Sequence, residues 1–129
     1  MRHLLILGGL FFSILGSELA VARNRLLKSC REHPQLVGKC FNVHGRLSVY
    51  NGAPALRIWK IGTKRILGVS EQRFTVDGVL NVPEEIRSQI NQDKLLFGDF
   101  VVCPFTQPRP NEMQLVCIEE VRNLRVRVR

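Results

Sequence analysis

The chain has 129 residues, of which 45% are hydrophobic and 23% are charged, and its formal net charge is +8 at pH 7. This length allows one modest hydrophobic core, and the apolar content excludes a fully disordered chain. Residues 40–121 carry nine basic and nine acidic side chains, so the positive excess lies in residues 23–39 and 122–129. Such flanks predict attraction to a membrane, an anionic polymer or nucleic acid, and the alternative is a pair of solvated tails that aid solubility.

The first 22 residues have the layout of a secretory signal peptide. A basic start precedes an apolar stretch over residues 4–15, and Ala20 and Ala22 supply a site of small residues for cleavage. The apolar stretch is too short to span a bilayer comfortably, although an uncleaved membrane anchor is the alternative. We therefore expect cleavage after Ala22, a periplasmic or extracellular location and no transmembrane segment in the remaining chain.

Four cysteines follow the predicted signal peptide: Cys30, Cys40, Cys103 and Cys117. An even number of cysteines in a small exported chain favours disulfides, and their spacing fits no zinc motif. Because two of them lie symmetrically about position 110, inside a predicted hairpin loop, we expect the pairs Cys103–Cys117 and Cys30–Cys40. Reduced, buried cysteines are the alternative. The sequence predicts no metal site and no cofactor.

Strict alternation of apolar and polar residues begins at Phe41 and indicates a β-hairpin. We expect a four-residue loop over residues 51–54, because it places Arg46 opposite Trp59, whereas a two-residue loop would place it opposite Arg57. The same loop places Ser48 opposite Arg57. The inward, apolar set of this hairpin is Phe41, Val43, Leu47, Val49, Leu56 and Ile58.

The rest of the chain predicts a short strand over residues 65–69, an edge strand over 74–76, a helix ending near 91–93, and a hairpin of strands 95–105 and 113–121. Pro83 is expected at the first helical position. Alternating strands with a helix between the third and fourth match a five-stranded, OB-like antiparallel barrel. The alternatives are a small β-sandwich or a split barrel.

Four segments follow from these elements: a signal peptide (1–22), a basic N-terminal flank (23–39), an OB-like domain (40–121) and a basic C-terminal tail (122–129). The tail either extends the last strand or is disordered. Gly45, inside the first strand, fits the sharp bend that this strand needs in order to serve both sides of a barrel.

The run GRLSVYNGAPALRIWKIGTKRILGV, followed by GDFVVCPF and MQLVCIEE, carries a resemblance. It is similar to a group of small, uncharacterised exported bacterial proteins with the pattern GRLS-YNG-P-RIW-GT-RILGV, and the similarity covers residues 40–121. The resemblance implies an envelope or secreted location, and it implies no activity.

The outward side chains of the first hairpin form the candidate binding site, which consists of His44, Arg46, Tyr50, Arg57 and Trp59. Aromatic rings interleaved with arginines on an OB-type sheet can stack bases or sugars and grip phosphate or carboxylate groups. The alternative is an ordinary polar sheet surface, in which arginine stems cover a packed tryptophan.

The sequence does not predict an enzyme. His44 is the only histidine in residues 40–121, and we expect no acid beside it. Glu119 and Glu120 are neighbours on a predicted strand, so their carboxylates point to opposite faces and form no catalytic pair.

We therefore expect an exported, disulfide-stabilised binding module for an anionic, carbohydrate or protein ligand of the cell envelope. One alternative is an envelope interaction or scaffold protein that its basic flanks hold to anionic surfaces, with the proline-rich loop 106–111 or a sheet edge as its specific site. Another is a small secreted hydrolase. Nucleic acid is a less favoured ligand, because the excess charge lies outside the hairpin.

Overall fold

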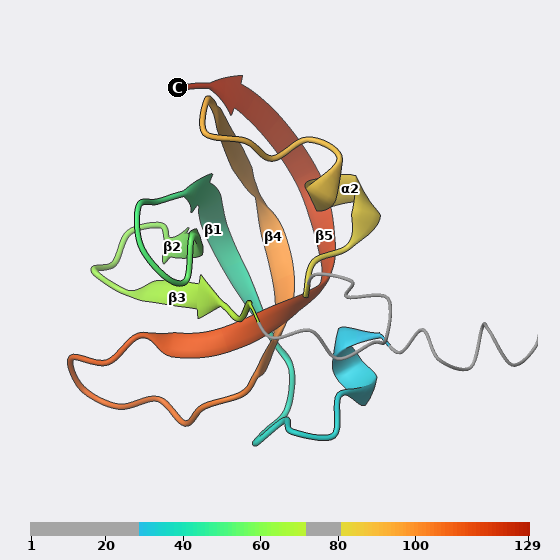
Figure 1. The fold of residues 1–129 in the computed structure, drawn as a ribbon, viewed down its shortest axis with the longest axis vertical. Coiled ribbons are helices and arrows are strands. Elements are labelled where there is room, and N and C mark those ends of the chain that lie inside the picture. Colours follow the sequence, from blue (N-terminus) through green and yellow to red (C-terminus); the bar gives the residue numbers. More distant parts are fainter. Residues whose placement is uncertain (1–28, 72–80) are drawn as a thin grey trace, which may run out of the picture.

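The computed structural model describes residues 29–71 and 81–129. The described chain is mainly β, with five strands in one sheet and a single short α-helix, as predicted (Figure 1). Its elements are η1 (Cys30–Glu32), β1 (Phe41–Val49), β2 (Leu56–Lys60), β3 (Ile66–Val69), α2 (Glu84–Arg87), β4 (Lys94–Pro104) and β5 (Gln114–Val128). The predicted signal peptide and the edge strand over 74–76 lie outside the described residues. No helix in the described ranges is long and apolar enough to cross a membrane.

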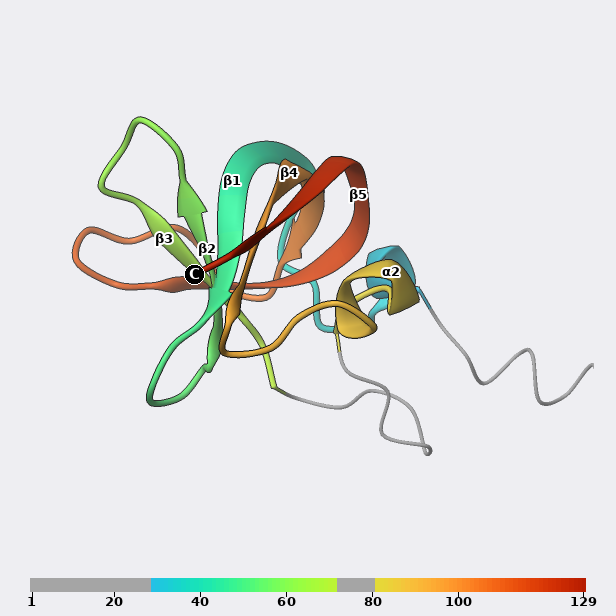
Figure 2. The same ribbon diagram turned by 90° about the horizontal axis from the view of Figure 1, so that it is seen from above.

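The strand pairings form a closed ring in the order β1-β2-β3-β5-β4. β1 pairs antiparallel with both β2 and β4, and β3 pairs parallel with β5. β1 serves two neighbours because it is long and curved, which is visible when the molecule is seen from above (Figure 2). One strand therefore joins the two hairpins of the fold, and it carries His44 and Arg46 of the predicted site.

The register of the first hairpin is the predicted one. Arg46 lies opposite Trp59, and Ser48 lies opposite Arg57. The backbone N–H of Tyr50 donates to the carbonyl of Ala55 at 2.7 Å, so the loop consists of the four residues 51–54. The like-charge pair that a two-residue loop would have created is thus avoided.

Gly45 lies at the bend of β1 for a steric reason. A Cβ atom at this position would stand 2.6 Å from Cγ2 of Ile58 and 2.9 Å from the carbonyl oxygen of Trp59. These distances are too short for any side chain, so β1 can curve across β2 only with glycine here. The core below this contact contains the predicted Val43, Leu47 and Ile58, all of which are buried.

The segment before β4 forms a shorter helix than predicted. Pro83 is the N-cap residue of α2, rather than its first helical residue, and the helix ends at Arg87 rather than near 91–93. Proline suits this position because its fixed φ and missing N–H cost nothing before the first turn. Ile86 is fully buried, and Ile90 packs against the core from the turn that follows.

β5 continues through the predicted C-terminal tail to Val128 and pairs with β4 from Val116 to Val128. The register shifts by one residue between the pair Asp99–Arg122 and the pair Phe97–Arg125. Asn123 lies in this bulge with a φ of 54°, a left-handed conformation that asparagine adopts more readily than most residues. Of the two alternatives for the tail, the extended strand is the one observed.

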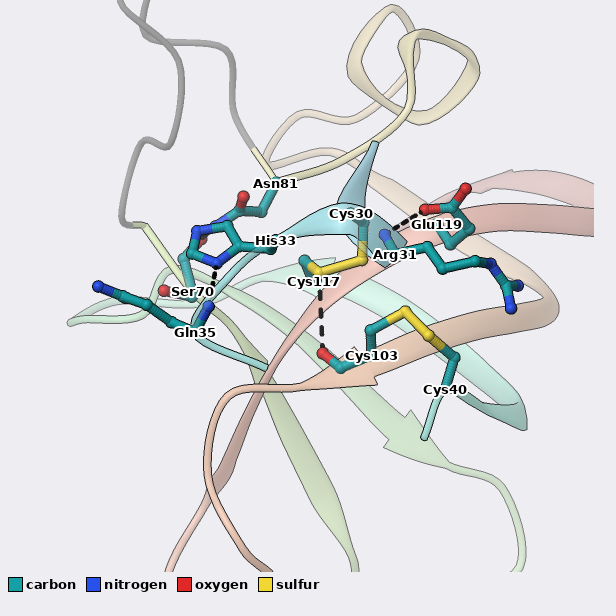
Figure 3. Close-up of a disulfide and its surroundings, with 10 residues drawn as sticks. All are labelled: Cys30, Arg31, His33, Gln35, Cys40, Ser70, Asn81, Cys103, Cys117 and Glu119. Carbon is teal, nitrogen blue, oxygen red and sulfur yellow. Dashed lines mark hydrogen bonds between the residues drawn. A yellow bond between two sulfur atoms is a disulfide. The ribbon is translucent and has the colours of Figure 1, made fainter. Parts of the chain in front are cut away.

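The four cysteines form two disulfides, but the predicted pairing was wrong. The bonds are Cys30–Cys117 and Cys40–Cys103 (Figure 3). Cys103 and Cys117 do lie opposite each other on β4 and β5, as the symmetry of the hairpin predicted. Each of them is bonded instead to a cysteine of residues 30–40, because that segment crosses the end of the hairpin.

Further contacts hold the N-terminal segment in place. The backbone N–H of Val37 donates to the carbonyl of Pro104 at 3.0 Å, and Arg31 donates its backbone N–H to the carboxylate of Glu119 at 2.7 Å. His33 is only 7% exposed and packs edge-on against Phe105, with 4.6 Å between ring centroids. We call this part of the molecule, with its two disulfides, the disulfide end.

Candidate functional site

The structure places the outward residues of the first hairpin on one side of the sheet, and β4 extends this side. Paired residues on adjacent strands point to the same face. Arg46 is paired with Trp59 on β2 and with Phe97 on β4, while His44 is paired with Asp99 on β4. The predicted hairpin face is therefore part of a wider surface.

Two arginines of this surface lie over aromatic rings. The guanidinium carbon of Arg46 is 5.0 Å from the centre of the Trp59 ring, and that of Arg57 is 4.9 Å from the centre of the Tyr50 ring. Trp59 is fixed further by its Nε1–H, which donates to the carbonyl of Thr63 at 2.7 Å. The rings thus hold the guanidinium groups in defined positions through cation–π contacts.

The end of β5 adds arginines that the sequence predicted to lie in a separate tail. Arg125 is paired with Phe97, and Arg127 lies over the Phe97 ring at 5.4 Å. Arg129 is two residues further along the chain and lies on the same side. Its guanidinium group donates to the carbonyl of Val49 at 3.5 Å. We call the resulting surface the arginine face; its members are Arg46, Arg57, Arg125, Arg127 and Arg129 with Tyr50, Trp59 and Phe97.

Tyr50 reports on the positive potential of the arginine face. Burial raises the pKa of its hydroxyl, but polar contacts with Ser48 and Arg46 and the charges of Arg46 and Arg129 outweigh this, so the pKa lies below 10.0. The Ser48 hydroxyl is buried and has no hydrogen-bond partner of good geometry among the described residues, so we attribute the shift mainly to the arginines. Arginines from β1 and from the chain end therefore act on one group.

His44 has a neighbour that its sequence pattern did not predict. Its Nδ1 lies 2.8 Å from Oδ1 of Asp99, and Nδ2 of Asn123 donates to Oδ2 of the same carboxylate at 2.9 Å. The hydrogen bonds from Asn123 and His44, together with the charges of His44 and Arg125, hold the pKa of Asp99 below its usual value. This acid marks one end of the arginine face.

A histidine oriented by a carboxylate is one component of a catalytic site, because such a pair can act as a general base. Over residues 29–71 and 81–129, no serine, threonine or cysteine side chain is hydrogen bonded to His44. The pair also stands on an exposed face, with the His44 side chain 61% exposed. The arrangement orients a titratable ring without supplying a nucleophile.

A shallow pocket of about 360 Å³ lies at the proline-rich loop, between it and the turn before β3. Its charged lining consists of Lys64, Arg65, Arg109 and Glu112. Arg65 is held by the buried amide of Gln114, whose Nε2 donates to the carbonyl of Thr106 at 2.9 Å. The pocket adjoins the predicted site at Trp59, which is paired with Ile66 of its lining.

Within the described ranges, the one group of side chains close enough to share a metal ion is Cys30, Cys103 and Cys117. Their sulfur atoms all take part in disulfides, so they offer no thiolate to a metal. No protein-family model, curated protein or solved structure matches the chain. A function must therefore be inferred from the geometry and charge of the arginine face.

Proposed function

We propose that the protein is an exported binding module with an OB-type barrel, and that it binds an anionic ligand of the cell envelope through the arginine face. The observation that carries this proposal is the joining of Arg125, Arg127 and Arg129 with Arg46 and Arg57 on one side of the sheet. Five arginines on one surface, with Asp99 and the Glu120–Arg122 ion pair at its edge, give a field that attracts anions.

The strand connections support the OB-type assignment. The closed order β1-β2-β3-β5-β4, with a parallel β3–β5 pairing and a helix between β3 and β4, is the arrangement expected of that barrel. OB barrels bind polymers on the face of their second and third strands and the adjoining loops, and the arginine face shares Arg57 and Trp59 of β2 with that region. The arginine face extends from there across β1 and β4 to the end of β5.

The two disulfides support export. Disulfides persist in oxidising compartments and are rare in the cytosol, where thiols are kept reduced. Both bonds close long loops, with sequence separations of 87 and 63 residues, and three of the four cysteines are buried. Together with the predicted signal peptide over residues 1–22, they favour a periplasmic or extracellular protein.

The alternative is an envelope interaction or scaffold protein, and the pocket at the proline-rich loop is the observation that favours it. A surface with Lys64, Arg65 and Arg109 around Pro108 could receive an acidic segment of a protein partner. An enzyme is not proposed, because the His44–Asp99 pair lacks a neighbouring nucleophile in the described part of the chain.

Salt-dependent binding to heparin, a sulfated polyanion, tests the proposal. We expect Arg125→Gln with Arg127→Gln to lower the affinity about tenfold or more and to reduce its salt dependence, since each lost contact releases fewer counterions. The matched control is Arg87→Gln with Arg109→Gln, which removes the same charge from α2 and the loop. If the two double variants lose affinity equally, the arginine face is not the binding site and the loop pocket or overall charge is responsible.

A further inference from the structure

The aromatic rings of the arginine face are already covered by arginines, and this decides what kind of anion the face can take. If the proposed function is right, we infer that the ligand is a phosphodiester chain recognised by its phosphates, of the poly(polyol phosphate) kind, and that no base is stacked on the rings. The inference rests on the proposed function and makes it more specific.

One face of each aromatic ring of this surface is occupied by an arginine. Trp59, Tyr50 and Phe97 each carry a guanidinium group, with guanidinium carbons 4.9–5.4 Å from the ring centres. Proteins that stack bases need an open aromatic face, and each base then contributes about 1–3 kcal/mol. Here a base that stacked on the occupied face would first have to displace an arginine from its ring.

The terminal nitrogens of Arg46 and Arg127 are the donors that a ligand can meet, because the Nε atom of Arg46 is buried and Arg57 already donates to the carbonyls of Pro54 and Asn51. A guanidinium group that lies flat on a ring keeps its N–H groups in its own plane, directed away from the ring. Such groups bind phosphate through two parallel hydrogen bonds, and the ring limits the entropy lost on binding. The rings therefore act as supports for anion-binding groups, and they need no contact with the ligand themselves.

The spacing of the arginines on β5 suits a regular polyanion. Arg125, Arg127 and Arg129 recur every second residue, and strand geometry places such residues about 6.6–6.8 Å apart. An extended chain with six backbone bonds between charges spans about 7 Å per repeat, as two peptide units do. Phosphodiesters of three-carbon polyols have this repeat, so successive phosphates can meet successive arginines.

An acidic residue at the edge of the arginine face limits where a phosphate chain can lie. Asp99 is negatively charged and lies beside His44 and Asn123 at the β4–β1 end. A phosphate chain placed along β5 would therefore run from Arg125 toward Arg129 and Tyr50, away from this carboxylate. The row of arginines on β5 is short, so we expect it to contact only a few phosphates of the ligand.

The experiment compares labelled oligomers with equal numbers of phosphates by fluorescence anisotropy. One has 1,3-propanediol spacers, one is oligothymidylate with the same backbone repeat, and one has dodecanediol spacers. We expect equal affinity for the first two, within about twofold, and at least about tenfold weaker binding of the long-spacer oligomer, because its successive phosphates are too far apart to meet successive arginines.

Arginine variants test whether the oligomers bind at the arginine face. Replacing Arg125, Arg127 and Arg129 by Gln should reduce the slope of log affinity against log salt by about 2, since single strands lose about 0.7 per contact. The equally charged control replaces Arg31, Arg87 and Arg109, which lie on η1, α2 and the proline-rich loop, and should leave the propanediol oligomer bound as before.

Three outcomes would overturn the inference. In the first, oligothymidylate binds about tenfold more tightly than the propanediol oligomer, and Trp59→Leu abolishes this difference. In the second, the propanediol and dodecanediol oligomers bind with equal affinity. In the third, the protein binds heparin but none of the phosphodiester oligomers. In each of these cases the proposed function stands, because an anion is still bound by the arginine face. If neither heparin nor the oligomers bind, the proposed function fails as well.

Discussion

The disulfide end and the arginine face occupy the same two strands, β4 and β5, and they are held together in opposite ways. At the disulfide end, Cys103 and Cys117 are fully buried and covalently bonded to the N-terminal segment. At the other end of the strands, Arg125 and Arg127 are exposed and held only by cross-strand and cation–π contacts. One end of the strands is therefore held by covalent bonds, while the other presents exposed positive charge.

The largest effect is expected at the disulfide end. Replacing Cys30 and Cys117 by Ala, or Cys40 and Cys103 by Ala, should lower the free energy of unfolding by about 3–5 kcal/mol, because each bond closes a long loop. Guanidinium denaturation of the oxidised protein measures this loss. Where the variants remain folded, heparin affinity should stay unchanged, which separates the two ends of the strands.

Peptide mapping without reductant provides the control for that prediction. It should recover the fragment that contains Cys30 joined to the fragment that contains Cys117. A link between Cys103 and Cys117, or a loss of stability below about 1 kcal/mol, would contradict the covalent account of the disulfide end.

A smaller effect is expected in the titration of Tyr50, which is the single tyrosine of the chain. The ultraviolet absorbance of tyrosinate should show a midpoint below pH 10.0, and Arg129→Gln should raise it. Because the pKa is lowered on folding, Tyr50 favours the folded state only as pH rises through its folded pKa, and it adds nothing at neutral pH. Arg87→Gln should leave the midpoint unchanged, and a wild-type midpoint above 10.0 would refute the positive potential.

The smallest effect is expected at Asp99. Its pKa is lowered on folding, so its stabilising contribution is present above about pH 3.9, the unfolded value, and is lost as pH falls through the folded value. The Tm of the wild type should exceed that of Asp99→Asn slightly at pH 7, by about 1–2 °C, and the two should converge in acid. A difference that persists at the lowest pH would mean that the carboxylate charge is not its cause.

The sequence by itself determined the first hairpin. Apolar and polar side chains alternate from Phe41 to Ile58, and only one strand register buries the apolar set. A shift of the register by one residue would expose Val43 and Leu47. The loop length followed from the cost of placing Arg46 against Arg57. These are local constraints, and they fixed the register, the inward set and the side on which His44, Arg46, Tyr50, Arg57 and Trp59 lie.

Only the tertiary structure decided the disulfide pairing and the extent of the arginine face. Symmetry about the hairpin loop placed Cys103 opposite Cys117, but it could not show that the N-terminal segment crosses there and bonds to both. The bulge at Asn123 changes the alternation of β5, so that Arg125 and Arg127 share a side with Arg122. Both features depend on contacts between residues far apart in the chain, which local patterns do not specify.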